Sequence, residues 1–144
     1  MTLVEVLIGV AILGILAAIA IPRMQEARNR SRRAEAQTNV RGIRTALFGA
    51  SFSGSSQVFT GAGPSPRTDS QLDKKAVPWV SDAGFDFLGY APDGDVRCNY
   101  TINLEDLDNM FVRGACDVDN DDELAEVLMT ATENPYLATP NEVY

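Results

Sequence analysis

Three aspartates near the C-terminus have a spacing suited to metal binding. Asp117, Asp119 and Asp121 alternate along an acidic run, and this 1, 3, 5 spacing converges oxygens on Ca²⁺ in an EF-hand loop. The run departs from the full EF-hand pattern at position 6, which is Asp122 instead of Gly, and at position 12, which is Leu128 instead of Glu. A calcium site here would therefore be of a non-EF-hand kind.

The same acids have a structural interpretation. Asp121 or Asp122 would cap a short helix over residues 123–130, because a helix N-terminus favours acidic side chains. A capping residue can also be a calcium ligand, so the two interpretations are compatible.

Enzyme chemistry has little support. The chain of 144 residues contains no histidine, which excludes Ser-His-Asp and Cys-His catalysis and His-ligated zinc. No phosphate loop or activated nucleophile is visible, so we expect no enzyme. Twelve Lys+Arg against 20 Asp+Glu give a net charge of −8, which argues against nucleic-acid binding because phosphate requires a basic surface.

Two cysteines allow one disulfide bond. Strand-like residues 96–104 and Met110–Cys116 flank a turn at residues 105–109. Pairing that is symmetric about this turn places Cys98 directly opposite Cys116, on the apolar face. Cross-strand Cβ atoms lie about 4.5–5.5 Å apart, near disulfide range, and the bond would stabilise the fold by roughly 3 kcal/mol. The alternative is two buried thiols in a reducing compartment.

The first 22 residues form an apolar segment with one charge, Glu5. As a helix they would span roughly 33 Å, close to the thickness of a bilayer core. A secretory signal fits poorly, because the basic residues follow the apolar run instead of preceding it. We expect that the chain begins inside a once longer N-terminus that has been processed.

Glu5 requires a partner, because a carboxylate in an apolar membrane helix costs about 2.5–3.5 kcal/mol on insertion scales. The nearest positive group is the amine of Met1, four residues away and on the same helical face. One interpretation is that Glu5 lies at headgroup level or pairs with its own amine. The other is that Glu5 meets the amine of a neighbouring copy and sets the axial register between subunits.

Met1-Thr2-Leu3-Val4-Glu5 and Leu16-Ala17-Ala18-Ile19-Ala20-Ile21-Pro22 together resemble the mature N-terminus of type IV pilins and pseudopilins. The resemblance implies that a prepilin peptidase cuts before residue 1 and N-methylates Met1, a position where Phe is commoner. It also implies that the helix holds the subunit in the inner membrane and then forms the core of a filament.

The basic residues and the resemblance point to opposite orientations. Arginines directly after the apolar run should hold that flank in the cytoplasm. The resemblance implies instead that the C-terminal domain lies outside the membrane.

Gly14 and Pro22 should kink or locally melt the helix. The resemblance implies that this stretch unwinds within filaments, although Gly and Pro are also common in membrane helices. Beyond Pro22, residues 23–52 continue as an amphipathic half of the same helix, which should end near residues 51–54. Its apolar stripe should pack on a sheet and consists of Ala36, Val40, Ile43 and Leu47.

Charge divides the chain into two parts. Residues 1–45 hold seven Arg against three Glu, a net +4, and the remainder is −12. A basic helix beside an acidic domain would help neighbouring subunits attract one another, or would bind anionic lipid headgroups.

The remaining residues predict a small head. Residues 53–76 are rich in Gly, Ser and Pro and indicate a surface loop. Residues 77–144 should form an antiparallel β-sheet head that includes a meander of three strands over residues 85–90, 96–104 and 110–116, with the acidic loop near the C-terminus and a terminal loop over residues 136–144. The expected fold class is therefore α+β, a long N-terminal, partly transmembrane helix packed on a small antiparallel sheet, the pilin fold.

The leading functional hypothesis is a type IV pilin that polymerises with identical copies into an extracellular fimbrium. The resemblance implies motility, adhesion or DNA uptake, pilus assembly machinery as a partner, and nucleic acid only through the filament. No cofactor is required, with Ca²⁺ as the one candidate. The alternatives are a type II secretion pseudopilin and a membrane-anchored calcium-binding or adhesive domain that never polymerises.

Overall fold

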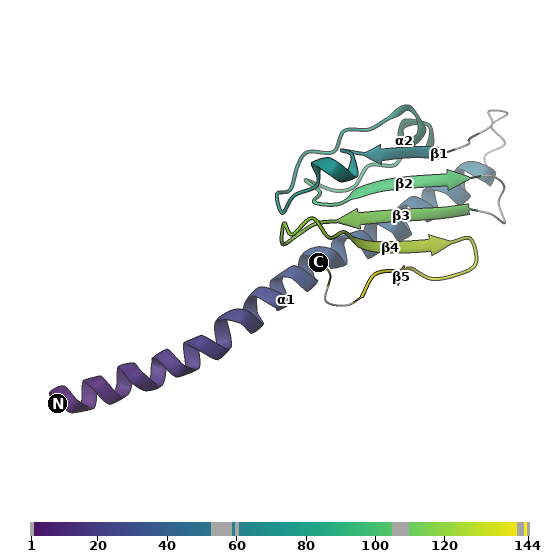
Figure 1. Ribbon diagram of the computed structural model, residues 1–144. Helices are drawn as coiled ribbons and strands as arrows, with labels where there is room; N and C mark the ends of the chain where they lie inside the picture. Colours follow the sequence, from purple (N-terminus) through teal and green to yellow (C-terminus); the bar gives the residue numbers. More distant parts are fainter. Residues whose placement is uncertain (1, 53–58, 60, 105–109, 141–142, 144) are drawn as a thin grey trace.

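The computed structural model describes the chain apart from residues 1, 53–58, 60, 105–109, 141–142 and 144. Its first element is helix α1, Leu3–Phe52, with 50 residues and a length of about 75 Å at 1.5 Å per residue. The predicted end of the helix, near residues 51–54, falls partly outside the described residues. The N-terminal half of α1 projects from the head, and the C-terminal half lies against the sheet (Figure 1).

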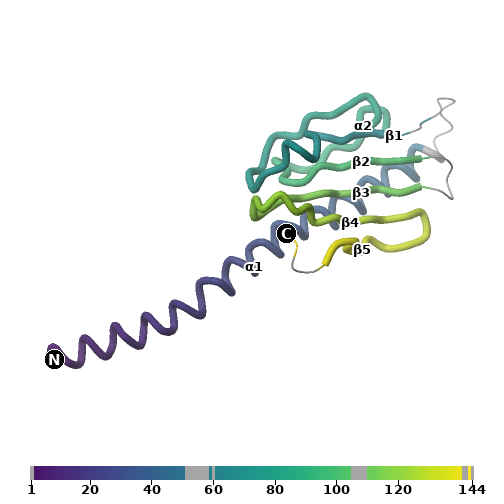
Figure 2. Tube along the Cα trace, in the orientation of Figure 1, coloured from purple at the N-terminus to yellow at the C-terminus, as the bar shows by residue number. Residues whose placement is uncertain are grey.

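Pro22 lies inside α1, and the helix is continuous on both sides of it. The trace follows a gentle curve through this region without a sharp break (Figure 2). A proline in a helix removes one backbone donor and crowds the preceding turn, which commonly kinks or breaks a helix, whereas α1 continues through Pro22. The unwinding expected between Gly14 and Pro22 concerns the filament, and it stays a prediction.

The head is one antiparallel sheet of five strands whose spatial order follows the sequence. The strands are β1 Gly61–Ser65, β2 Asn99–Leu104, β3 Met110–Cys116, β4 Ala125–Thr130 and β5 Tyr136–Leu137. A 3-10 turn, η1 Asp69–Gln71, and a short helix, α2 Ala83–Leu88, lie between β1 and β2 in the sequence. The predicted α+β architecture is confirmed.

One apolar stripe of α1 joins the helix to the sheet. Ala36, Val40 and Ile43 are fully buried, and Leu47 is nearly so, which confirms the predicted face. The helix lies so close to β3 that a Cβ on Gly114 would approach Val40 Cγ2 to 3.1 Å and Ala36 Cβ to 3.3 Å. A small residue is therefore required where the helix crosses this strand.

The register of β2 and β3 is the predicted one, with Ile102 opposite Val112 and Leu104 opposite Met110. The disulfide between Cys98 and Cys116 is present, with a Cα–Cα distance of 4.3 Å. Both cysteines are fully buried. The prediction of the pairing is confirmed.

The strand predicted over residues 85–90 is wrong, because this segment forms helix α2. Asp82 caps the helix by accepting a hydrogen bond from the Phe85 amide at 2.9 Å, and Gly89 ends it with φ of 63°. Phe85 and Leu88, three residues apart, are its buried positions. The capping Asp and the terminal Gly were visible in the sequence and indicate a helix.

The helix predicted over residues 123–130 is also wrong, because residues 125–130 form β4. Ala125, Val127 and Met129 are buried and alternate with more exposed residues, a period of two that belongs to a strand. The acids before this segment therefore do not cap a helix there.

The segment predicted as a loop, residues 53–76, contains β1 and η1. Gly63 has φ of 89°, and a Cβ there would lie 2.2 Å from the Tyr100 carbonyl oxygen, so glycine permits the close approach of β1 to β2. β1 is an edge strand, where the proline that it contains is tolerated. The terminal segment expected to be a loop likewise contributes the short strand β5.

We predict that replacing both cysteines by alanine lowers the free energy of unfolding of the head by about 3 kcal/mol, because the open chain regains the entropy that the loop closure removes. Thermal unfolding of the full chain in detergent measures this change. Wild-type protein treated with a reductant is the control and should unfold at the temperature of the variant. Two alkylatable thiols in native, unreduced protein would contradict the bond.

Candidate assembly surface and acidic loop

The N-terminal half of α1 exposes a continuous apolar surface. Its large apolar residues are 46–77% exposed, as at Leu3 (77%), Leu13 (66%) and Ile21 (51%). By length and composition the helix can cross a membrane, and the apolar window is 0% buried within the described residues. An uncovered surface of this size requires lipid or other protein as its surroundings.

Glu5 and Thr2 bond reciprocally at the start of α1. The Thr2 amide donates to Glu5 Oε2 at 2.6 Å, and the Glu5 amide donates to Thr2 Oγ1 at 3.3 Å. This is a capping box, which satisfies two of the free donors of the helix N-terminus. The sequence shows the box as Thr followed three residues later by Glu, a signal that our sequence interpretation missed.

The capping box turns the Glu5 carboxylate back toward the N-terminal end of the chain. Met1 lies outside the described residues, so the pairing of Glu5 with the amine of Met1, and the methylation of that amine, stay predictions. A carboxylate aimed in this direction is accessible to an amine at the helix end.

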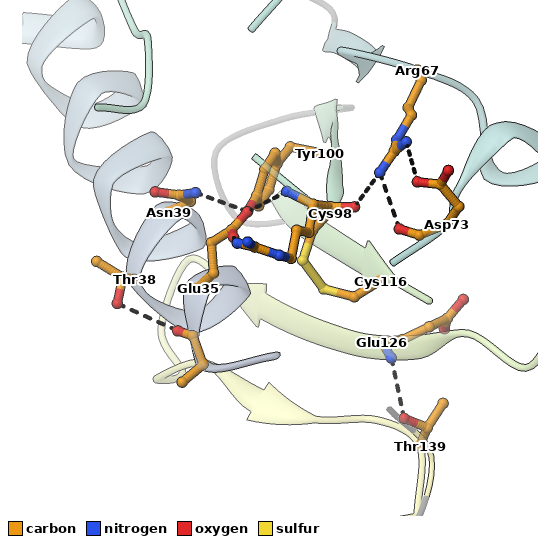
Figure 3. The surroundings of a disulfide bond; sticks show 12 residues. Glu35, Thr38, Asn39, Arg67, Asp73, Cys98, Tyr100, Cys116, Glu126 and Thr139 are labelled. Atoms are coloured by element: carbon orange, nitrogen blue, oxygen red, sulfur yellow. Dashed lines mark hydrogen bonds and ion pairs between the residues drawn. A yellow bond between two sulfur atoms is a disulfide. The ribbon is translucent and has the colours of Figure 1, made fainter. Parts of the chain in front are cut away.

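A partly buried polar contact joins α1 to the head (Figure 3). Asn39 donates to the Tyr100 hydroxyl oxygen at 2.8 Å, and that hydroxyl donates to Glu35 Oε1 at 3.4 Å. Glu35 also accepts from the Arg97 amide at 2.8 Å. Helix residues Glu35 and Asn39 are thus bonded to β2 and to the segment before it, beside the disulfide.

The two tyrosines of this contact region are held as neutral phenols. Burial, with the nearby negative charge of Glu35 as a smaller cause, raises the pKa of Tyr100 far above its usual range. Burial raises the pKa of Tyr90 to about 12. Tyr90 donates to the Asn39 carbonyl oxygen at 3.2 Å, so both rings hold the same turn of α1.

We predict that Tyr100→Phe destabilises the head by about 1–3 kcal/mol, because Asn39 and Glu35 each lose a buried hydrogen-bond partner. Denaturant unfolding followed by the fluorescence of the single tryptophan, Trp79, measures the change. Tyr136→Phe is the matched control, since this ring is 44% exposed, and should leave stability within about 0.5 kcal/mol. Equal effects of the two substitutions would argue against the polar contact.

The structure brings the three predicted aspartates together. One carboxylate oxygen from each of Asp117, Asp119 and Asp121 lies within 4.8 Å of the others. Asn120 and Asp122 adopt the left-handed conformation, with φ of 67° and 66°, and these reversals fold the loop around the carboxylates. The Asn120 amide donates to Asp117 Oδ1 at 2.6 Å, which closes the first turn.

Of the three aspartates, Asp119 has the carboxylate with the least compensation for its burial and for its negative neighbours. Its Oδ1 atom is buried and finds no hydrogen-bond partner among the described residues. Burial, followed by the negative charges of Asp121 and Asp117, raises the pKa of Asp119. A buried carboxylate oxygen that faces like charges is the arrangement that a bound cation would relieve. The donor set therefore fits Ca²⁺, which prefers oxygen ligands and would take its remaining ligands from carbonyl groups or water.

The architecture defines a class of protein: a long N-terminal apolar helix packed on a small antiparallel five-stranded sheet is the pilin-like α+β arrangement. The chain is similar to the type IV major pilin protein PilA of Myxococcus xanthus (strain DK1622), with 53% identity over 45 residues, which are 31% of this chain. The match covers 20% of the length of that relative. Together with the apolar helix, it confirms the resemblance to type IV pilins.

Two further comparisons add no relatives. No family model matches the chain, and no solved structure matches it.

Proposed function

We propose that this chain is a structural subunit that polymerises through its N-terminal helix into a type IV pilus filament. The observation that carries the proposal is the apolar half of α1, which projects from the head and is covered by nothing in the described chain. The similarity to a type IV major pilin supports the same role. The protein performs no catalysis in this function, and its activity is assembly.

The proposed mechanism has two stages that use the same surface. The apolar segment first lies in the inner membrane, where a prepilin peptidase processes the chain and methylates Met1. The assembly machinery then transfers the helix from lipid to a bundle of identical helices, which forms the core of an extracellular fimbrium. Motility, adhesion or DNA uptake would follow from that filament.

In this mechanism Glu5 sets the axial register between neighbouring subunits. Burial of its carboxylate among apolar helices is unfavourable unless it meets a positive group. The amine of Met1 on a neighbouring copy would supply that charge at one axial offset between subunits. The capping contact with Thr2 holds the carboxylate toward that end of the helix.

We predict that Glu5→Ala leaves membrane insertion intact but reduces surface filaments by at least tenfold, because subunits lose the contact that fixes their offset. Electron microscopy and immunoblotting of sheared surface material measure the filaments, and the membrane fraction measures insertion. Glu26→Ala is the matched control, because Glu26 lies on the same helix beyond the apolar run. Normal filaments from Glu5→Ala would contradict the register role.

Wild-type protein found wholly in the membrane fraction, with no filaments, would contradict the proposed function itself. It would favour the anchored, non-polymerising domain.

A calcium ion in the acidic loop is a second proposal, supported by the convergence of Asp117, Asp119 and Asp121 and by the unpartnered Asp119 Oδ1. The ion would fix the conformation of the β3–β4 connection, which carries all three carboxylates. Related acidic loops near the C-terminus bind calcium in some pilins and pseudopilins, and a calcium site would favour the pseudopilin alternative.

We predict that millimolar Ca²⁺ raises the melting temperature of the wild type and that Asp119→Asn abolishes the increase. Without calcium, Asp119→Asn should itself be slightly stabilising near neutral pH. The reason is that a raised pKa in the folded state means that stability is lost as pH rises and the carboxyl ionises. Scanning calorimetry in EDTA and in calcium measures both effects.

Glu133→Gln is the control for charge and should keep the calcium response, since Glu133 lies beyond β4 and outside the cluster. A wild type with neither binding heat nor a shift in melting temperature would remove the calcium proposal.

A further inference from the structure

An acidic run and a pair of arginines lie toward opposite ends of the head. The β3–β4 connection lies at the end of the sheet from which the N-terminal half of α1 emerges, and the β4–β5 connection lies at the opposite end (Figure 1). The first connection carries the acidic run from Asp117 to Glu123. The second borders a groove that contains two arginines of α1. The head therefore has an acidic end near the projecting helix and a basic groove far from it.

The groove has a volume of about 590 Å³ and is open to solvent. It is lined by Arg41, Arg44, Thr45, Phe48, Met129 and Asn134.

The two arginines differ in how firmly they are held. Arg44 bonds to the Ala131 carbonyl oxygen and lies 5.3 Å from the centre of the Phe48 ring, so it is part of the wall. Arg41 is exposed and forms no ion pair with any described residue. The groove thus presents the Arg41 guanidinium, which has no ion-pair partner among the described residues, together with the apolar side chains of Phe48 and Met129. This combination suits a carboxylate side chain with an aliphatic stem.

The acidic end offers matching groups. Asp122 and Glu123 are exposed and make no ion pairs within the part of the chain that is described. The Glu123 amide donates to Asp121 Oδ1 at 2.9 Å, so the backbone that presents these side chains is held in place. Neither carboxylate belongs to the three that converge on the candidate calcium position.

We propose that the groove of one subunit binds the acidic loop of a second copy, with Glu123 of one chain paired with Arg41 of the next. The inference rests on the proposed function, because association of the apolar halves of α1 brings copies together side by side and in parallel. An axial offset between such copies then places the acidic end of one head against the basic groove of another.

Chain geometry makes this contact directional. The two surfaces lie at opposite ends of β4, which spans six residues and about 20 Å, so they cannot meet within one subunit. A contact between two different surfaces is heterologous, and it generates an open helical assembly when the rotation between successive copies does not close a ring. Residues 1–45, with a net charge of +4, and the remainder of the chain, with a net charge of −12, carry the opposite charges that this assembly would bring together.

Glu133, which precedes the groove residue Asn134, is bonded to the last residue of β4. Its Oε2 atom accepts from the Thr130 hydroxyl at 3.5 Å, and its amide donates to Thr130 Oγ1 at 3.2 Å. Residues 105–109 add three acids to the sequence but lie outside the described residues, and they form no part of the proposal.

A charge exchange tests the pair in the full chain. We expect Arg41→Glu and Glu123→Arg each to reduce recovered surface filaments by about fivefold, a factor equal to about 1 kcal/mol and typical of an ion pair at a partly exposed contact. The double variant should restore filaments toward wild type, since every subunit then carries both reversed partners. High salt should weaken wild-type contacts of this kind.

Matched controls change the same charges elsewhere on the head. Lys74→Glu and Asp93→Arg replace exposed side chains outside both surfaces and should leave filament yield unchanged. A double variant that is no better than the single variants, or controls that fail equally, would overturn the proposed pair.

Cross-linking separates this proposal from the filament proposal. The variant with Arg41→Cys and Glu123→Cys should form a ladder of disulfide-linked oligomers in oxidised membranes, because each chain can join two neighbours. If the wild type forms no filaments but the double-cysteine variant forms this ladder, the proposed filament is contradicted. The proposed docking contact between copies is then still supported. Monomers alone on the non-reducing gel would overturn the docking contact, even where wild-type filaments form.

Discussion

The structure depends on one constraint: the chain makes an apolar helix much longer than its own head can cover. The stripe from Ala36 to Leu47 is buried against the sheet, whereas the apolar half before Pro22 has no cover in the described chain. Hydrophobic surface of this extent is stable only in lipid or against other protein. Under the proposed function, a subunit that moved from membrane to filament would exchange one of these surroundings for the other without refolding its head.

The head serves to hold the helix rigidly in one orientation. A single apolar stripe would permit the helix to slide or rotate on the sheet, because hydrophobic packing has little directionality. The bonds from Glu35 and Asn39 to Tyr100 and the Arg97 amide add direction, and the disulfide beside them fixes the strands that carry these partners. These contacts therefore fix the position of the projecting half of α1 relative to both ends of the head.

Charge adds polarity to this arrangement. The acidic β3–β4 connection and the arginines beside the β4–β5 connection lie at opposite ends of the same strand, so these two surfaces of opposite charge are separated along the direction of the helix. Packing between apolar helices alone would hold subunits together but would give little preference for one axial offset between them over another. A register contact at Glu5 and a head contact at the groove would act on the same offset from two places on the molecule.

The sequence by itself determined the apolar helix, the buried stripe, the register of β2 and β3, and the pairing of Cys98 with Cys116, because each rests on a period or a symmetry that extends over many residues. The sequence interpretation misassigned α2 and β4, which are six residues each, since so short a segment fits both periods. For α2 the capping Asp82 and the terminal Gly89 were a local signal for a helix, whereas β4 had no such signal against the predicted helix. Only the tertiary structure brought Tyr100 to Glu35 and Asn39, and only it joined Arg41 to the end of β4 in one groove. These contacts link residues far apart in the chain, and their formation depends on how the helix crosses the sheet, which no local pattern encodes.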